Sequence, residues 1–335
     1  APPVRHPTPH GDVRGFSFLA PPRAMRHLSR PGFSRLLARM TRHALLAALC
    51  LFLAASCTGV RERGAIAPTL TLASWNMEHL AEHDGSGCRP RTEADYAAMR
   101  AYVEALGADV VAFQEVESKA AAERVFDPAR YTVEIEARVG TGRKGECGGR
   151  PGLTVNAQRT GFAIRKGVAY QRLADVTALQ VGNPDLRSGV DLIVRPAGGA
   201  PMRVLSVHLK AGCTAGDRNE ACPVLLQQVP VLERWIDQRA GEGLRFAVLG
   251  DYNRRLSVPG DVVWADLDDG LPANADLARA SGDQGARCNP RYPDFIDYIV
   301  LDRRAADDLV GFEESRYPGE SLSDHCAIAA RLTLR

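Results

Sequence analysis

The feature that most restricts the fold of this chain is a series of short apolar runs, rich in β-branched residues, that recurs from residue 70 onward. Runs of this length, separated by polar and glycine-containing segments, are typical of buried β-strands. We expect strands at residues 70–74, 109–113, 131–135, 161–165, 190–194, 202–207, 245–249, 295–301 and 326–332. The core is therefore expected to be built largely from β-sheet.

Helical patterns are fewer and lie between these runs, at residues 92–106, 223–239 and 261–267. The first begins at Thr92, and Asp95 three positions later approximates a capping box. Many strands with few helices predict a mixed α/β layered domain and not a regular parallel βαβ array. No long linker and no internal repeat divides residues 69–335, so we expect one domain there.

The first 57 residues differ in composition from the rest. From Met40 a short basic start, an apolar run at 44–55 and small residues ending at Cys57 form the pattern of a secretory signal peptide, residues 40–57. The twelve-residue apolar run is shorter than the roughly 20 residues that span a bilayer. Residues 1–39 show no domain pattern, and we expect them to be disordered or to lie upstream of the true start, at Met40 or Met25.

Cys57 closes a sequence, Leu53 to Cys57, that resembles a bacterial lipoprotein lipobox with its leucine one position too early. Two interpretations stay open: lipidation of Cys57, which would anchor the protein to a membrane, or ordinary cleavage and release. Thr58 would direct a lipoprotein to the outer membrane. Either way we expect an exported protein, periplasmic, attached to the outer membrane or secreted.

The basic side chains are concentrated in this leader. It holds eight arginines and one aspartate of the chain's 42 basic and 40 acidic residues, so 34 basic and 39 acidic residues remain after Cys57, a formal charge of −5. A domain with this charge lacks the field of a high-affinity, nonspecific nucleic-acid binder. An enzyme that contacts a few phosphates through a metal is not excluded.

Six cysteines follow the leader, and an even number in an exported protein favours disulfides. Cys213 and Cys222 bracket a short polar loop and are the expected local pair. Cys147 lies in a glycine-rich stretch, 140–152, that is expected to be a surface loop and lacks the Lys-Ser/Thr ending of a P-loop. No two cysteines are spaced as zinc ligands usually are. The other cysteines are Cys88, Cys288 and Cys326.

Polar side chains that can bind a metal or transfer a proton occur at the ends of the expected strands. Such groups are costly to bury unless they are paired or bound to a metal, and their recurrence suggests one shared site. Asp251 and Asn253, two residues apart, would share a face of an extended segment. The alternative interpretation is that these residues form turns, lie at the surface or pack in the core, in which case they would have no role in a site. The set is Asn76, Glu115, His208, Asp251, Asn253, Asp297, Asp324 and His325.

Carboxylates, amide oxygens and imidazoles without cysteine suit a hard cation such as Mg²⁺ or Mn²⁺. A cation of this kind can neutralise a phosphoryl oxygen while a carboxylate orients water and an imidazole stabilises the transition state. The residue types therefore indicate phosphate chemistry.

The motifs WNMEHL, FQEVE, SVHLKAGC, GDYNR, DFIDYIV and SDH follow one another from Trp75 to His325. In this order they resemble the successive motifs of the endonuclease/exonuclease/phosphatase superfamily, and together with the leader they resemble an exported bacterial member. The resemblance implies a DNase I-like fold, a four-layer α/β/β/α sandwich of two mixed β-sheets in a single domain.

Carried over residue by residue, the resemblance implies that Asn76, Glu115 and Asp324 lie at the metal, with Glu115 the principal ligand. Asp251 would activate the attacking water, and Asn253 would hold that water or a phosphoryl oxygen. His325, oriented by Asp297, and His208 would contact the scissile phosphate. These eight residues are the candidate metal ligands and catalytic groups.

The resemblance is incomplete around His208, for which DNase-like members provide an acidic partner. Glu134 and Glu136 are the nearest candidates, and Arg187 is a candidate phosphate contact. Glu78 is expected close behind the metal site. The remaining polar residues after the first motif, His79, Glu82 and His83, are expected at the surface.

Three functions stay open at this point. The first is a metal-dependent phosphodiesterase, a nuclease acting on DNA, RNA or nucleotides. The second is a phospholipid or sphingolipid phosphodiesterase, disfavoured because no aromatic-aliphatic hairpin for membrane entry is visible and aromatic content is only 6%. The third is a catalytically silent surface lipoprotein, disfavoured because the motif residues are all present. We expect a monomer.

Overall fold

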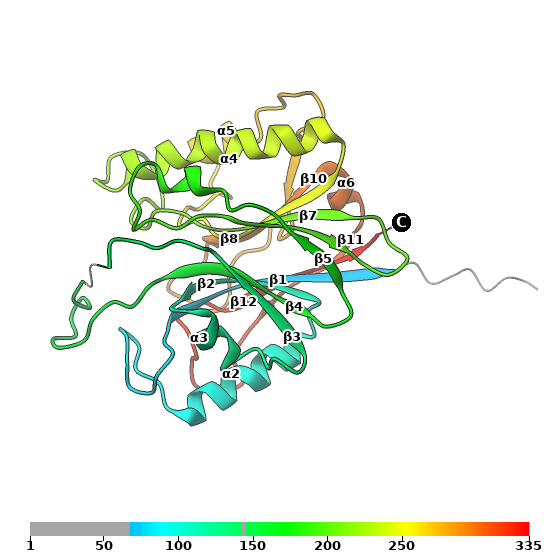
Figure 1. Cartoon of the computed structure of the whole chain (residues 1–335). Coiled ribbons are helices and arrows are strands. Elements are labelled where there is room, and N and C mark those ends of the chain that lie inside the picture. The colour runs from blue at the N-terminus through cyan, green and yellow to red at the C-terminus, as the bar shows by residue number, and fades with distance from the viewer. Residues whose placement is uncertain (1–67, 143–144, 335) are drawn as a thin grey trace, which may run out of the picture. The chain divides into compact units, whose positions relative to one another are not determined.

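Twelve strands, gathered into two sheets of six, form the centre of the structure within residues 68–142 and 145–334, which are those that the computed structural model describes (Figure 1). In the first sheet the order is β11-β12-β1-β2-β4-β3, and in the second it is β5-β6-β7-β8-β10-β9. The strands of the first sheet are β1 Thr69–Leu80, β2 Val110–Val116, β3 Tyr131–Ile135, β4 Arg159–Arg165, β11 Leu309–Ser315 and β12 Ala327–Thr333. Those of the second are β5 Ala169–Arg172, β6 Val190–Arg195, β7 Met202–His208, β8 Arg245–Asp251, β9 Leu277–Arg279 and β10 Asp297–Asp302.

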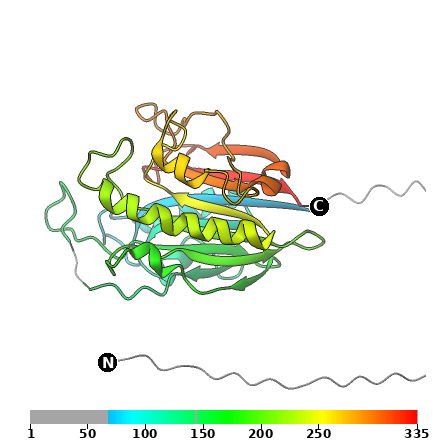
Figure 2. The same cartoon turned by 90° about the horizontal axis from the view of Figure 1, so that it is seen from above.

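Helices cover the outer face of each sheet, which gives the four layers that the resemblance implied (Figures 1 and 2). Helices α2 (Glu93–Leu106) and α3 (Lys119–Glu123) cover the first sheet, and α4 (Cys222–Glu242) and α5 (Val262–Leu267) cover the second. The short α6 (Arg303–Asp307) follows β10, and a 3₁₀ turn, η1, spans Thr177–Gln180. The capping box at Thr92 and Asp95 is present, with the Thr92 amide donating to Asp95 over 2.7 Å.

Both faces of the central strands are buried, and this explains why they appear as continuous apolar runs. Along β1, Leu70 and Leu72 belong to the core between the sheets, whereas Ala73 and Trp75 belong to the core beneath α2. Successive side chains of a strand point to opposite faces, so one strand supplies two cores.

The strand directions bring the ends of several strands to one edge. β1 runs parallel to β2, and β7 runs parallel to β8, so the carboxyl ends of each pair lie together. β12 is antiparallel to β1 and β10 is antiparallel to β8, so these two strands begin at the edge where their partners end. Segments with motifs far apart in the sequence therefore meet at this edge.

All nine expected strands and all three expected helices are present, and three strands were not foreseen. These are β5, β9 and β11, each at an edge of its sheet. Strand β1 is longer than expected and reaches Leu80 through an irregular segment in which Glu78 and His79 have positive φ.

The described residues contain three disulfides, Cys88–Cys147, Cys213–Cys222 and Cys288–Cys326. The expected local pair, Cys213 with Cys222, is confirmed. The expected signal peptide, residues 40–57, and residues 1–39 lie outside the described residues. Within the described part of the chain, none of the helices combines the length and apolar character needed to cross a membrane.

Candidate active site

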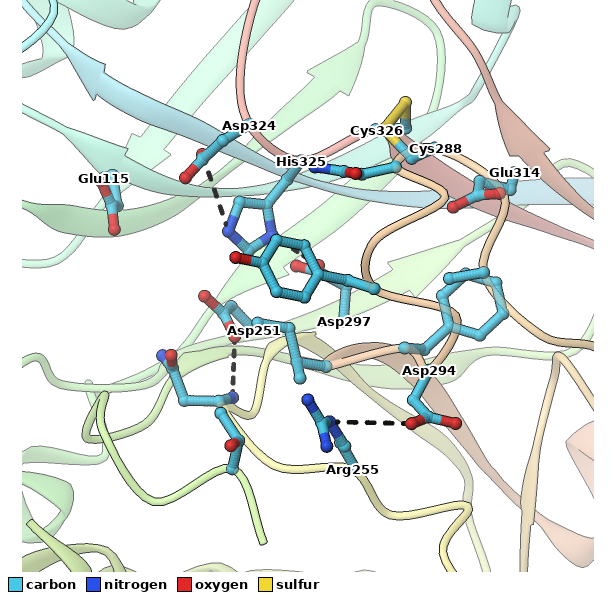
Figure 3. A pocket seen from close by; sticks show the side chains of 17 residues that line it. Glu115, Asp251, Arg255, Cys288, Asp294, Asp297, Glu314, Asp324, His325 and Cys326 are labelled. Atoms are coloured by element: carbon cyan, nitrogen blue, oxygen red, sulfur yellow. Dashed lines mark hydrogen bonds and ion pairs between the residues drawn. A yellow bond between two sulfur atoms is a disulfide. The ribbon is translucent and has the colours of Figure 1, made fainter. Parts of the chain in front are cut away.

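A cavity of about 490 Å³ opens at the edge where the strand ends meet (Figure 3). Six of the eight candidate residues line it, namely Glu115, Asp251, Asn253, Asp297, Asp324 and His325. The other two, Asn76 and His208, are buried and contact Asp251. The structure thus brings all eight candidates to one place.

Asp251 lies at the centre of this arrangement, at the end of β8. Its Oδ2 accepts a hydrogen bond from the Asn76 side-chain amide over 3.0 Å, and its Oδ1 accepts one from the backbone amide of Asn253 over 2.7 Å. The preceding Gly250 lets β8 approach β7 closely, because a Cβ atom there would overlap the Val207 carbonyl. The position of the carboxylate therefore depends on glycine at 250.

Glu115 ends β2 in a left-handed conformation, with φ at 60°, that turns its carboxylate toward the cavity. Its Oε1 accepts from the Asn76 amide over 3.3 Å, so Asn76 joins the two carboxylates. Its Oε2 accepts from the His79 backbone amide over 3.1 Å, and the His79 ring lies 3.7 Å away. His79, expected at the surface, instead supports Glu115, because β1 is irregular between Asn76 and Leu80 before it pairs with β2 again at Val116.

His325 forms a pair with Asp297 across the cavity. Its Nδ1 lies 2.6 Å from Asp297 Oδ2, and its Nε2 faces Asp324 Oδ1 at 3.8 Å (Figure 3). The Ser323 hydroxyl accepts from the His325 amide and donates to the Asn76 carbonyl, which ties this segment to β1. The sequence predicted a strand from 295 to 301 with Asp297 inside it, whereas in the structure Asp297 is the first residue of β10.

Burial and neighbouring charges shift the pKa values of Asp251 and His325 in directions that suit proton transfer. Burial and the nearby Asp297 raise the pKa of Asp251 to about 7. Burial disfavours the charged form of His325, but the carboxylates of Asp297, Asp251 and Asp324 outweigh this and hold its pKa well above the usual range. An imidazolium therefore faces a readily protonated carboxylate.

His208, at the end of β7, has the opposite character. Its Nε2 lies 3.6 Å from Asp251 Oδ2 and 3.8 Å from Glu115 Oε1. Burial and the positive charge of Arg187 lower its pKa well below the usual value, so it is neutral near pH 7. Its Nδ1 is buried and has no hydrogen-bond partner among the described residues.

The candidates named around His208 are engaged elsewhere. Glu136 accepts from the Ser188 amide and pairs with Arg138, and Glu134 accepts from the Tyr170 hydroxyl. Arg187 donates to the backbone carbonyls of His208 and Leu209, so it holds the end of β7. The acidic neighbours of His208 in the structure are Glu115 and Asp251 instead.

The comparison with protein families decides how this arrangement is classified. Residues 73–325 match the endonuclease/exonuclease/phosphatase family, three quarters of the chain. The chain belongs to this family. Its members hydrolyse phosphoesters, and the match contains every one of the eight candidate residues.

Solved structures share the fold of this family member at low sequence identity. The human Nocturnin catalytic domain, with bound sulfate, has a TM-score of 0.58 at 13% identity and covers 80% of this chain and 94% of its own. TDP2 from D. rerio, in complex with a single-strand DNA product, has a TM-score of 0.53 at 18% identity and covers 78% of this chain and 98% of its own. ANGEL2, a 2′,3′-cyclic phosphatase, has a TM-score of 0.50 at 15% identity and covers 80% of this chain and 98% of its own. No curated protein sequence matches this chain.

The donor atoms of the site fit a hard cation. Asp251, Asp297 and His325 offer ligand atoms within 4.8 Å of one another, and the buried Asp297 Oδ1 has no hydrogen-bond partner among the described residues. This group differs from the three ligands that the sequence indicated, Asn76, Glu115 and Asp324. Since the hydrogen bond between Asp297 and His325 already occupies Oδ2 and Nδ1, we regard the carboxylates on the Glu115 side as the better cation ligands.

Glu78 and Arg89 form a pair behind the site, and of these two the motif pattern pointed only to Glu78. Glu78 accepts hydrogen bonds from the Asp324 amide and from the Arg89 guanidinium, and Arg89 also donates to the Ser321 carbonyl. Glu78 lies near the site as expected, whereas no sequence motif marks Arg89. Their shared role is visible only once the loops after β1 and before β12 are placed together.

Proposed function

We propose that this protein is a divalent-metal-dependent phosphodiesterase that hydrolyses nucleic acids or nucleotides. The observation that carries the proposal is the convergence of Glu115, Asp251 and His325 with their partners in one cavity. Family membership supports phosphoester hydrolysis. Mg²⁺ or Mn²⁺ is the proposed cofactor because the donors are oxygens and imidazole nitrogens.

Glu115, Asn76 and Asp324 would hold the proposed cation, as the resemblance to the family implies, and Asp251 would remain free to act on the water. When bound, such a cation neutralises charge on a phosphoryl oxygen and on the leaving oxygen. The amide bridge from Asn76 keeps Glu115 and Asp251 at a fixed separation. The His79 amide donates to the second oxygen of Glu115, which orients the carboxylate.

The side chains of the chain supply the other requirements of in-line hydrolysis. Asp251 accepts a proton from the attacking water, and its pKa of about 7 is close to the ideal value for a general base at neutral pH. The imidazolium of His325, held by Asp297, stabilises negative charge on the phosphoryl oxygens. Neutral His208, whose Nε2 lies 3.6 Å from Asp251 Oδ2, would donate a hydrogen bond to a phosphoryl oxygen of the substrate.

Asn253 is placed to hold the water against Asp251. It follows Asp251 by two residues in a left-handed conformation, with φ at 51°, and its side-chain amide donates to the Leu209 carbonyl. This bond fixes the amide plane, so its oxygen has a defined direction. We assign Asn253 to positioning the water or a phosphoryl oxygen.

The cellular setting is also a proposal. Export through the segment 40–57, with or without lipidation of Cys57, would place a monomeric enzyme where extracellular DNA or RNA is accessible. Phospholipid and sphingolipid substrates are the alternative class, and a substrate panel separates the two.

The full-length protein should hydrolyse bis-p-nitrophenyl phosphate and plasmid DNA with Mg²⁺ or Mn²⁺, and a chelator should abolish both activities. We expect Glu115→Ala and Asp251→Asn to lower kcat by roughly 10²-fold or more, the scale of losing one charge-stabilising group. Glu313→Ala, which removes an exposed acid from β11, is the control. Folded Glu115 and Asp251 variants with undiminished rates would contradict the assignment, as would full activity in the chelator.

A further inference from the structure

A second cavity, of about 850 Å³, adjoins the catalytic one. The two share Cys288, Asn289, Asp324 and Cys326 as lining residues. Figure 3 shows the Cys288–Cys326 disulfide beside His325 and Asp324. The two cavities are therefore neighbours on either side of the disulfide, and a molecule bound at His325 lies next to the second cavity.

Three arginines from separated segments line this second cavity, and we call it the arginine cavity. Arg89 follows β1, Arg287 precedes β10, and Arg316 lies between β11 and β12. Among the described residues that line it, Asp324 is the single acid. The arginine cavity is therefore a positively charged hollow on a chain whose charge after the leader is −5.

The three arginines differ in how they are held. Arg89 is fixed by its ion pair with Glu78 and by its hydrogen bond to the Ser321 carbonyl over 2.6 Å. The guanidinium groups of Arg287 and Arg316 are exposed and form no ion pair or side-chain hydrogen bond in the described part of the chain. Stabilisation of the fold does not account for these two guanidinium groups, because neither has a partner among the residues that the structure describes.

The chain connectivity links the arginine cavity to the catalytic site. Arg287 immediately precedes Cys288, and His325 immediately precedes Cys326. The disulfide between the two cysteines therefore keeps the backbone at Arg287 close to the backbone at His325. The Arg287 backbone amide also donates to Glu314 over 2.6 Å, which fixes the base of this side chain.

Guanidinium groups bind phosphate oxygens through paired, charge-assisted hydrogen bonds, and free arginines in a concave surface are a typical phosphate site. We propose that the arginine cavity binds a second phosphate of the substrate, the backbone phosphate that neighbours the scissile phosphodiester in a single nucleic-acid strand. This inference rests on the proposed function and specifies its substrate as one with at least two phosphates.

A strand is favoured over a lipid headgroup by the distribution of apolar side chains. Of the large hydrophobic residues exposed in the described part of the chain, Tyr292 alone lines either cavity. Insertion into a bilayer requires a cluster of apolar side chains at the mouth of the site. The surroundings of the arginine cavity are polar and suit a nucleic-acid strand dissolved in water.

The test compares thymidine dinucleotides that carry one phosphate, TpT, or two, pTpT and TpTp. The full-length protein with its metal should show a kcat/KM for one of the two-phosphate substrates that exceeds the value for TpT by roughly tenfold or more, the scale of charge-assisted hydrogen bonds. In the Arg287→Gln/Arg316→Gln double variant this ratio should fall close to one. Arg195→Gln, which removes an exposed arginine at the far end of β6, should keep the wild-type ratio.

A ratio near one in the wild type, or a high ratio retained in the double variant, overturns the inference. If the wild type hydrolyses neither plasmid DNA nor any of the three dinucleotides, the proposed function fails. In that case, or if only the dinucleotides resist hydrolysis, calorimetric binding decides about the arginine cavity separately. Tighter binding of pTpT or TpTp than of TpT, lost in the double variant, supports it, and equal binding refutes it. The assignment to a nucleic-acid strand is also overturned if the double variant loses more binding to phosphatidylinositol bisphosphate vesicles than to the dinucleotides.

Discussion

Single backbone positions decide where the reactive side chains of this protein point. Glu115 and Asn253 have φ values of 60° and 51°, a region that costs energy for residues other than glycine and is retained where the surroundings enforce it. At Glu115 the carboxylate is held by Asn76 and His79, and at Asn253 the backbone amide is held by Asp251. The sequence indicated both residues by type and motif, but it carries no sign of their backbone conformation.

Gly250→Ala tests this dependence at the residue scale. Its φ is 151°, and an added Cβ would overlap the Val207 carbonyl of β7, so β8 must move away and carry Asp251 with it. We expect a loss of about 2–4 kcal/mol in the free energy of unfolding, measured by denaturant titration, and a larger proportional loss in kcat.

The matched control is Gly241→Ala in α4, where nothing lies within 4 Å of the added Cβ. This variant should gain up to about 1 kcal/mol, because alanine is the better helix former. If Gly250→Ala were as stable and as active as the wild type, close packing of β8 on β7 would not position Asp251.

At the scale of elements, continuous apolar runs were a reliable signal for central strands, because these strands bury both faces. The three strands that were missed lie at sheet edges, where one side has no partner strand. Strand β5 alternates exposed and half-buried residues, β9 has three residues, and β11 contains Gly311 and several half-buried positions. Such segments form strands through pairing with a neighbour, which the sequence of the segment itself does not show.

Helix α4 carries an unfavourable group of acids that makes stability depend on pH. Burial, followed by Asp237, Asp269 and Asp266, raises the pKa of Glu233 from 4.5 to about 7. Glu233 Oε2 and Asp237 Oδ1 are buried and have no hydrogen-bond partner among the described residues. Between about pH 4.5 and 7 the folded protein binds a proton that the unfolded chain has lost, so stability falls as pH rises through this window.

Glu233→Gln removes this penalty. We expect the variant to be more stable than the wild type above pH 7, by about 1 kcal/mol after allowance for the partial exposure of Glu233, and the difference should vanish near pH 4.5. Thermal unfolding across pH 4.5 to 8 measures the effect. Glu242→Gln removes an acid that pairs with Arg239 on the same helix and should give no gain. A pH-independent difference for Glu233→Gln would show that a cause other than ionisation acts.

For the molecule as a whole, the active site is assembled by topology and held by covalent links. The motifs predicted which residues meet, since each follows or precedes a strand whose end lies at one edge of the two sheets. They could not predict contributions from loops, such as that of Arg89, because a loop position depends on distant segments. The three disulfides among the described residues link the connecting segments that leave or enter the strands at this edge. Cross-links are thus concentrated where regular hydrogen bonding stops.

The Cys288–Cys326 disulfide should therefore matter more for catalysis than for folding. By chain entropy, its loop with a sequence separation of 38 stabilises the folded state by about 4 kcal/mol, against about 3 kcal/mol for Cys213–Cys222 with a separation of 9. The two disulfides contribute similarly to stability, but of these two Cys288–Cys326 is the one that adjoins His325. We expect Cys288→Ser/Cys326→Ser to lower kcat at least tenfold more than Cys213→Ser/Cys222→Ser, at a temperature where denaturant titration shows both variants folded.

Because His325 is also held by Asp297 and by the Ser323 hydroxyl, loss of the disulfide should loosen the imidazole without releasing it. The pH optimum should therefore persist while kcat falls. Equal effects of the two double variants on kcat would mean that hydrogen bonds alone position the catalytic histidine.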